Sequence, residues 1–249
     1  MVIKLDPHTH TIVSGHAYST LLENAAAASA IGLEIMAVTD HGPKMPGGPH
    51  QIYFMNLDIL PRVISGVEIL RGVEANIIDH KGTLDIKDEI LKDLDLVIAS
   101  LHPPCVPPGA VSENTGALIG AMSNPNVKIL GHLGDPRYPL DIPAVIKAAK
   151  SWNIIIEINN HSLDTRSFRS GGADTLRDII RECIDNEVFL ILGSDAHFAS
   201  KVGDFTHARK MADELNTPAS LLLNYDPLKF KEAIGFSLNN QGESYGHIG

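Results

Sequence analysis

Short apolar runs recur along the chain at intervals of about 30 residues, and polar or turn-forming residues separate them. Runs of this length between turn signals are typical of strands that are buried on both faces of a parallel sheet. The chain contains seven of them, at residues 2–5, 35–38, 69–73, 94–99, 127–130, 153–158 and 188–192. The pattern therefore predicts seven buried strands.

Helical periodicity fills the segments between these runs, most clearly at residues 21–31, 142–151 and 175–186. In the last segment, apolar residues recur at helical spacing from Leu176 to Cys183 and define one face. The alternation of strand and helix is typical of repeated βα units around a parallel sheet. A closed barrel and an open doubly wound sheet are both compatible with seven such units.

Polar side chains that can bind metals follow each predicted strand. In chain order they are His8 with His10, Asp40 with His41, Glu74, His102, His132, His161 after two asparagines, and Asp195 with His197. An open sheet would concentrate its site at one switch point, whereas a closed barrel brings all strand ends to one mouth. The pattern therefore favours an α/β fold of the TIM-like class, a seven-stranded (β/α)7 barrel.

Composition narrows the class of protein. The chain has 249 residues, 44% of them apolar, and at this size about three quarters of the surface can be buried without structural staples. With two cysteines, Cys105 and Cys183, a disulfide framework is not expected. The first residues resemble neither a signal peptide nor a membrane span, so we expect a cytoplasmic protein. One domain is expected over residues 1–235, followed by a tail at 236–249 that is rich in Gly, Asn and Ser.

Charge and histidine content change the picture further. Thirty acidic residues against 20 basic ones give a net charge of −10, which makes nucleic acid and anionic membranes unfavourable partners. Histidine occurs 12 times, and it is both a common metal ligand and a common acid or base near neutral pH. The composition thus points to a site built from imidazoles.

The spacing of these side chains predicts a metal cluster. Residues i and i+2 of a strand project to the same side, so His8 pairs with His10 and Asp195 pairs with His197. Closure of the barrel makes the first and last strands neighbours and brings the two pairs together. Nine candidate ligands are too many for one ion and suit three: His8, His10, His16, His41, Glu74, His102, His132, Asp195 and His197.

Adjacency divides these ligands into three sets, one for each divalent ion. The sets are His8, His10, Glu74 and Asp195; Glu74, His102 and His132; and His16, His41 and His197. Glu74 is the expected bridge, because its two carboxylate oxygens can serve two ions.

Other polar residues near the strand ends are candidates for catalysis. Asp40 precedes a candidate ligand and would support it from behind, and His161 follows the sixth predicted strand. Lys44, Arg137 and Arg166 lie in loops after strands, where a cation could bind phosphate. We expect Asp40, His161 and Arg166 to contribute to catalysis.

Six short motifs resemble those of the PHP (polymerase and histidinol phosphatase) family. They are His8-Thr9-His10, Thr39-Asp40-His41-Gly42, Gly72-Val73-Glu74, Ser100-Leu101-His102, Gly131-His132 and Ser194-Asp195-Ala196-His197. The positions of His16 and His41 resemble the YcdX-like branch of metal-dependent phosphatases most closely. The resemblance implies a distorted barrel, a trinuclear site that commonly holds zinc, and a tendency to form homo-oligomers. Manganese and iron are the alternative ions, since His and carboxylate ligands accommodate all three.

Charge also predicts the class of substrate. Three divalent ions, two carboxylates and seven neutral imidazoles carry about +4 in total, which favours an anion. A water held by zinc, with its pKa lowered to roughly 7, could attack the phosphorus of a bound ester. We therefore expect a phosphoric ester hydrolase, a phosphatase that acts on a small phosphorylated molecule.

Three other functions stay open. A phosphodiesterase or exonuclease acting on nucleic acid is disfavoured by the net charge of −10 and by the few cations and aromatic residues in the loops. An amidohydrolase-like C–N hydrolase also uses a His-x-His pair, but it typically needs a bridging lysine, and no lysine ends the fourth apolar run. A metal buffer without catalysis would bind ions and hydrolyse nothing.

Overall fold

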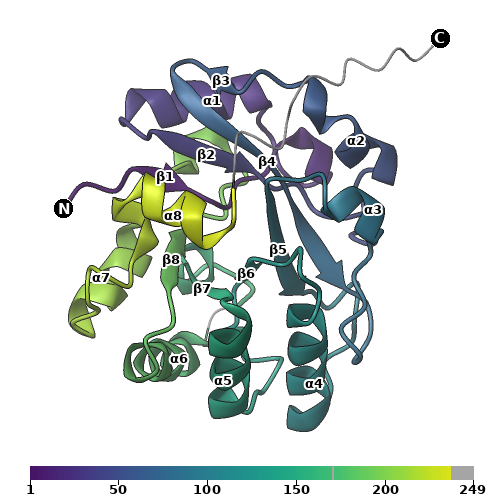
Figure 1. Ribbon diagram of the computed structural model, residues 1–249, viewed down its shortest axis with the longest axis vertical. Coiled ribbons are helices and arrows are strands. Elements are labelled where there is room, and N and C mark those ends of the chain that lie inside the picture. The colour runs from purple at the N-terminus through teal and green to yellow at the C-terminus, as the bar shows by residue number, and fades with distance from the viewer. Residues whose placement is uncertain (170, 237–249) are drawn as a thin grey trace.

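The computed structural model describes residues 1–169 and 171–236. Among these residues, parallel strands form one sheet in the order β1 (Leu5–Asp6), β2 (Ile35–Val38), β4 (Val67–Ile77), β5 (Leu96–Leu101), β6 (Ile129–Leu130), β7 (Ile155–Asn159) and β8 (Leu190–Gly193). The short strand β3 (Val63–Ile64) pairs antiparallel with β4. The sheet curls into a nearly closed, TIM-like barrel (Figure 1), which confirms the predicted fold class.

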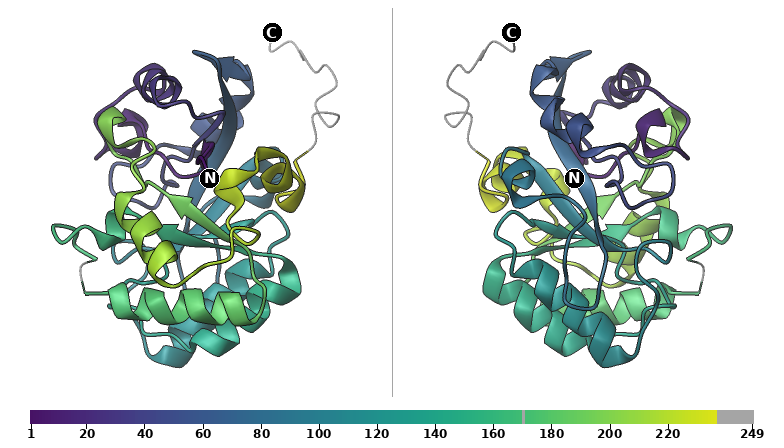
Figure 2. Two further views of the ribbon diagram at one scale, coloured as in Figure 1. Left: turned by 90° about the vertical axis from the view of Figure 1, so that its left-hand side faces the viewer. Right: turned by 90° about the vertical axis from the view of Figure 1, so that its right-hand side faces the viewer.

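Helices surround the barrel and connect its strands. They are α1 (Leu21–Ala30), α2 (Gln51–Met55), α3 (Asp88–Leu91), α4 (Val111–Met122), α5 (Ile142–Trp152), α6 (Ala173–Asp185), α7 (Thr206–Glu214) and α8 (Pro227–Ala233). Single 3-10 turns occur at η1 (Ile12–Ser14), η2 (Leu57–Ile59), η3 (His161–Leu163), η4 (Ala199–Lys201) and η5 (Leu223–Tyr225). Helices α4, α5 and α6 lie side by side on one flank of the barrel, and α1 and α2 lie on the opposite flank (Figures 1 and 2).

Local sequence explains where these helices begin and end. Helix α5 starts after Asp141, whose carboxylate accepts a hydrogen bond from Ala144 N, and it ends at Asn153 in the left-handed region. Helix α1 starts at a capping box in which Thr20 and Glu23 satisfy each other's backbone N–H groups. The three helices predicted at 21–31, 142–151 and 175–186 are confirmed, with bounds shifted by at most two residues.

Six of the seven predicted strands have different bounds in the structure, and the first and third differ most. The first begins at Leu5, because Val2 is 73% exposed and lies outside the barrel. The third extends to Ile77, because the polar residues Glu74 and Asn76 are fully buried within it. Polarity therefore marked the end of the apolar run at residue 73 but not the end of the strand.

The core has layers inside and outside the barrel wall. The interior is filled by one buried residue or more from each parallel strand: Leu5, Ile35, Ala37, Leu70, Leu96, Ile98, Ile129, Ile155 and Ile191. Phe230 and Ile234, from α8 and the residue after it, pack against this set and close the amino-terminal end of the barrel. A second cluster joins the outer face of the sheet to α4, α5, α6 and α7, and it includes the buried thiol Cys183 as predicted. Burial of the interior leaves the carboxyl ends of the strands as the mouth where polar side chains gather.

One side chain bridges the seam between β1 and β8 below the backbone bonds that join residues 8–10 to 195–196. Within the described residues, β1 and β8 are the two ends of the sheet order. The buried amide of Asn224 bridges them: its Nδ2 donates to Leu5 O (3.1 Å) and Leu192 O (2.8 Å), and its Oδ1 accepts from Leu192 N (2.7 Å). An amide thus replaces the backbone ladder at this position, which accounts for the expected distortion of the barrel.

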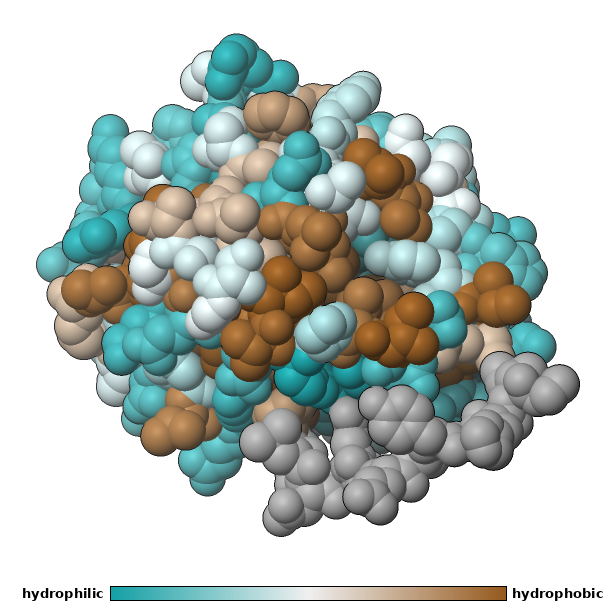
Figure 3. Space-filling model, turned by 90° about the horizontal axis from the view of Figure 1, so that it is seen from above, coloured by the Kyte–Doolittle hydropathy of each residue, from teal (hydrophilic) through white to brown (hydrophobic). Residues whose placement is uncertain are grey.

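The surface over α1 and α2 is partly apolar (Figure 3). Exposed aliphatic side chains come from α1, from the residue after it, and from α2, η2 and β3. They are Leu22, Ile31, Ile52, Met55, Ile59 and Val63. No helix among the described residues is long and apolar enough to cross a membrane. The predicted homo-oligomer stays a prediction, and so does the single domain over 1–235; the tail predicted from residue 236 lies, apart from its first residue, outside the described residues.

Replacing Asn224 with Ala should destabilise the protein by about 2–4 kcal/mol, because three buried backbone groups lose their partners. Urea unfolding followed by circular dichroism measures the change. Asn186, which is half-buried and donates to Glu182, is the matched control, and Asn186→Ala should cost about 1 kcal/mol or less. Equal losses for the two variants would contradict a special role for Asn224.

Candidate metal centre

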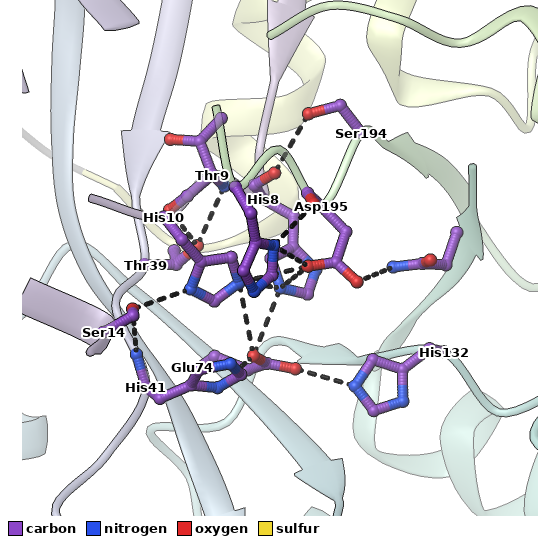
Figure 4. Close-up of polar contacts among 12 residues, drawn as sticks. His8, Thr9, His10, Ser14, Thr39, His41, Glu74, His132, Ser194 and Asp195 are labelled. Atoms are coloured by element: carbon purple, nitrogen blue, oxygen red, sulfur yellow. Dashed lines mark hydrogen bonds and ion pairs between the residues drawn. The ribbon is translucent and has the colours of Figure 1, made fainter. Parts of the chain in front are cut away.

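Side chains from the carboxyl ends of strands converge at the mouth of the barrel (Figure 4). They are His8 and His10 after β1, His41 after β2, Glu74 in β4, His102 after β5, His132 after β6, and Asp195 and His197 after β8. All are buried except His197, whose side chain is 24% exposed. Eight of the nine residues predicted as ligands thus share one buried cluster.

Glu74 lies at the centre of this cluster. Its Oε2 is 2.7 Å from His41 Nδ1 and 3.4 Å from His8 Nε2. Its Oε1 is 2.8 Å from His132 Nε2 and 3.3 Å from His102 Nε2. His10 Nε2 also lies 3.5 Å from Oε2. The two oxygens therefore face different imidazoles, which is the arrangement that a bridging carboxylate needs.

The two strand-end pairs meet where the barrel closes. A parallel bridge joins Thr9 to Ala196, and the residues that flank them, His8 with His10 and Asp195 with His197, gather in the cluster. His10 Nε2 lies 3.2 Å from Asp195 Oδ1. The contact between the first and last strands therefore builds the side of the cluster opposite Glu74.

The groups of ligand atoms differ from the predicted sets. Atoms within 4.8 Å of one another form three groups: His10, His41 and His197; His8, His10 and Glu74; and His41, Glu74 and His102. His16, predicted beside His41 and His197, is exposed and lies outside these groups, although its ring centroid is 4.9 Å from each of those two rings. His16 therefore lies beside both of its predicted partners, and its role as a ligand stays a prediction.

Three imidazoles are oriented by partners behind them. His8 Nδ1 donates to Glu157 Oε1 (2.7 Å) and His102 Nδ1 donates to Asn76 Oδ1 (2.8 Å). His10 Nδ1 lies 3.0 Å from Ser14 Oγ. Because an acceptor holds the proton on Nδ1, the Nε2 lone pair of each ring points into the cluster, as a metal ligand requires.

Asp40 acts on the cluster through Ser14 rather than directly. Its carboxylate accepts hydrogen bonds from Thr11 N (2.7 Å), Thr11 Oγ1 (2.9 Å), Ser14 Oγ (2.7 Å) and Tyr53 Oη (2.7 Å). Burial and the Asp40 charge raise the pKa of Tyr53, so the phenol stays protonated and donates. Since Ser14 gives its proton to Asp40, its oxygen is free to accept from His10. Sequence reasoning expected a catalytic residue here, and the geometry gives a positioning residue.

The remaining candidates lie at the rim. His161 is half-buried, and its ring centroid is 6.1 Å from that of His197. Arg166 is 81% exposed and pairs with Asp164 in its own loop (2.8 Å), so the structure does not direct it at the cluster. Arg137 pairs with Asp135, and Lys44 is exposed. Of these, His161 is the one that borders the site.

Sequence reasoning missed two buried charged residues. Glu157 Oε1 accepts from His8 and its Oε2 accepts from His132 N (2.8 Å); a Cβ at Gly193 would lie 1.9 Å from Oε1, so a glycine is needed there. Arg169 donates to Asp195 Oδ2 (2.8 Å). Glu157 carried a weak signal, because it is an acidic residue among the isoleucines of a predicted buried strand. Arg169 lies in an irregular loop, where no pattern marks it.

Protonation suits metal binding at most of the cluster, whereas at His8 the charges of Glu157, Glu74 and Asp195 outweigh burial and raise the pKa. Burial lowers the pKa of His10 to about 4 and the pKa values of His41 and His197 to about 3, so these imidazoles are neutral at pH 7. Burial acts against ionisation of Glu74, but the neighbouring His102, His8 and His41 outweigh it and hold its pKa well below the usual range. Neutral imidazoles and ionised carboxylates are the forms that bind divalent ions.

Three buried atoms of the cluster support this interpretation. Glu74 Oε2, Asp195 Oδ1 and His41 Nδ1 make no hydrogen bond of good geometry among the described residues, although Glu74 Oε2 and His41 Nδ1 lie 2.7 Å apart. A buried polar atom without a partner is costly, and each of these atoms faces the interior of the cluster. The residues therefore fit divalent metal ions, which would satisfy all three atoms at once.

Comparisons with known proteins agree with this geometry. The chain is 50% identical over 225 residues to a probable phosphatase from Clostridium novyi, covering 90% of this chain and 91% of that one. It is 49% identical over 230 residues to a probable phosphatase from Clostridium acetobutylicum, covering 92% and 93% of the two chains. No family model matches the chain.

Solved structures share the fold at low identity. Histidinol phosphate phosphatase from Lactococcus lactis, solved with zinc, L-histidinol and phosphate, matches with a TM-score of 0.57 and 20% identity over 86% of this chain and 94% of that one. A putative histidinol phosphatase from Listeria monocytogenes matches with a TM-score of 0.58 and 14% identity over 81% and 98%.

Glu157→Gln should weaken metal binding about 10- to 100-fold, although the two side chains have the same shape. Glu157 uses both oxygens as acceptors, and a glutamine must turn a donor toward either His8 or His132 N. Competition with a chromophoric chelator measures the affinity. The exposed Glu89→Gln is the control and should bind as the wild type does; wild-type affinity in Glu157→Gln would refute the role.

Removing metal with a chelator should lower the melting temperature, because ions that bind only the folded state stabilise it, by about 2.7 kcal/mol at a free concentration 100 times Kd. Calorimetry before and after treatment measures the shift, and added zinc or manganese should reverse it. Chelator already saturated with zinc is the control. An unchanged melting temperature after complete metal removal would show that the cluster is structurally self-sufficient.

Proposed function

We propose that this chain, which belongs to the family of bacterial proteins named probable phosphatases, is a metal-dependent phosphatase that hydrolyses phosphate monoesters of small molecules. The observation that carries the proposal is the buried cluster of imidazoles around Glu74, with ligand atoms that make no hydrogen bond of good geometry among the described residues. The zinc and phosphate held by the Lactococcus lactis protein of the same fold support it.

The proposed site holds three divalent ions, zinc foremost, with Glu74 between two of them. The nine candidate ligands support this number, although the three groups of ligand atoms share His10, His41 and Glu74. The exposed His16, whose ring lies 4.9 Å from those of His41 and His197, would complete the third set. These ions would neutralise phosphate oxygens and lower the pKa of a bound water for attack on phosphorus. We also propose that the chain belongs to the PHP family and to its YcdX-like branch, which its motifs resemble.

The protein's own residues would orient this chemistry. Glu157, Ser14 and Asn76 hold His8, His10 and His102 in one tautomer each. Arg169 holds Asp195 through its second oxygen, so that Oδ1 faces the cluster. His161, at the rim beside His197, is the candidate to donate a proton to the leaving alcohol.

Glu74→Gln should reduce kcat at least 1,000-fold, on the order of the loss for an essential electrostatic group, because the amide cannot serve two ions through two anionic oxygens. Phosphate release from p-nitrophenyl phosphate and from a panel of metabolite monoesters measures turnover, and elemental analysis measures bound metal.

Glu89→Gln serves again as the control and should keep full activity. A folded Glu74→Gln protein with near-native turnover would refute the assignment of Glu74. Wild-type protein with stoichiometric metal and no hydrolysis of any ester would instead favour a metal-storage function.

A further inference from the structure

The three groups of candidate ligand atoms differ in their exposure to solvent. We call the two groups that contain Glu74 the inner groups, and the group of His10, His41 and His197 the outer group. Every member of the inner groups is at most 3% exposed. In the outer group, the side chain of His197 is 24% exposed, and the exposed His16 lies beside it with ring centroids 4.9 Å apart. The outer group is therefore the part of the cluster that opens to solvent.

The groups also differ in charge. Each inner group contains the carboxylate of Glu74, whereas the outer group consists of imidazoles alone. Asp195 faces the outer group with one oxygen, Oδ1, which lies 3.4 Å from His197 Nδ1, but its other oxygen pairs with Arg169 (2.8 Å). Coulomb attraction weakens with distance and with exposure to water. An ion in the outer group would therefore be held less strongly than an ion beside Glu74.

Hydrogen bonds hold the inner ligands more firmly than the outer ones. His8 and His102 each donate from Nδ1 to a buried side-chain acceptor, at 2.7 and 2.8 Å. His197 Nδ1 lies 3.0 Å from a backbone oxygen within its own loop, and the ring of His16 packs against two other imidazole rings. Partners behind a ligand strengthen metal binding about 10- to 100-fold. The ligands that open to solvent are thus also the less firmly supported ones.

Exposure, charge and support all distinguish the outer group from the inner groups. An incoming ligand reaches an exposed ion directly, whereas a buried ion leaves only after the protein opens locally. Without an outer ion, the site would carry about +2 instead of about +4 and would attract a phosphate ester less strongly.

We propose, on the basis of the three-ion phosphatase proposed above, that the divalent ion of the outer group exchanges with solution, that the two ions beside Glu74 are retained, and that turnover requires all three. The protein would thus be stored as a two-ion form that becomes active when it takes up one more ion. Its activity would follow the concentration of free metal.

Release of zinc to an excess of a chromophoric chelator tests the proposal, because the absorbance counts ions as they leave the protein. From the zinc-loaded protein we expect one equivalent in a fast phase and two in a slow phase, with rates at least about 10-fold apart. Elemental analysis of protein recovered after the fast phase should find two ions. Turnover of p-nitrophenyl phosphate should be lost at that point and should return after addition of one equivalent of zinc.

A variant of the exposed ligand assigns the fast phase to the outer group. His16→Gln should remove the fast phase or speed it at least about 10-fold, and it should leave the slow phase unchanged. His207→Gln is the matched control, because His207 is also exposed but lies on α7 and belongs to none of the groups. It should release zinc as the wild type does. Circular dichroism checks that both variants are folded.

Three results would overturn the exchangeable ion. They are release of all ions in one phase, fewer than three ions in the loaded wild type, and a fast phase of wild-type rate and amplitude in His16→Gln. Full turnover by the two-ion form would overturn its role in activity.

Zinc release needs no substrate, so the experiment separates this inference from the proposed function. Release in one phase from a protein that hydrolyses esters would overturn the exchangeable ion and keep the phosphatase. Release in two phases from a protein that hydrolyses no ester would overturn the phosphatase and keep the exchangeable ion.

Discussion

The contact between the first and last strands is the constraint on which the site depends. His10 N donates to Ala196 O and Asp195 N donates to His8 O, so the loops after β1 and β8 are held side by side. Without this contact, the imidazoles after β1 would face Glu74 alone, and the cluster would lack its second carboxylate. Because Asn224 bridges the same seam one layer below, a polar side chain in the wall of the barrel also supports the ligands at its mouth.

Orientation of the imidazoles is the second requirement. A histidine has two ring nitrogens, and burial alone does not decide which one carries the proton. Glu157, Asn76 and the Ser14–Asp40 pair decide it for three rings by accepting from Nδ1. Each of these partners is itself held by further hydrogen bonds, since Asp85 binds Asn76 and Tyr53 binds Asp40. The orientation of these imidazoles is thus fixed both by their direct partners and by the residues that hold those partners.

The candidate ligands could be predicted from the sequence, because most of them directly follow or lie within a recognisable strand. The residues that hydrogen-bond to them largely could not, because they come from distant segments that only the fold brings together. His8 and His10 flank one residue after an apolar run, a pattern that topology converts into proximity. Arg169 reaches Asp195 from an irregular loop, and Ser14 reaches His10 from a 3-10 turn, so neither has a periodicity to read. His16 is exposed, yet its ring lies 4.9 Å from the rings of His41 and His197, so its predicted role as a ligand stays a prediction.

Backbone strain marks the site independently of its chemistry. His132 has φ 34° and Asp195 has φ 54°, conformations that cost on the order of 1–3 kcal/mol for residues with a side chain. Other residues with positive φ, such as Asn153 after α5 and Ser65 in the β3–β4 hairpin, sit in turns where the chain must reverse. At His132 and Asp195 the chain gains no such turn of secondary structure. The unusual backbone instead orients the two side chains. Glu157 accepts from the backbone N–H of His132 and Arg169 donates to the carboxylate of Asp195, so both side chains point at Glu74 and its neighbours. The convergence of these side chains on Glu74 and its neighbours therefore accounts for strain that the fold alone does not require.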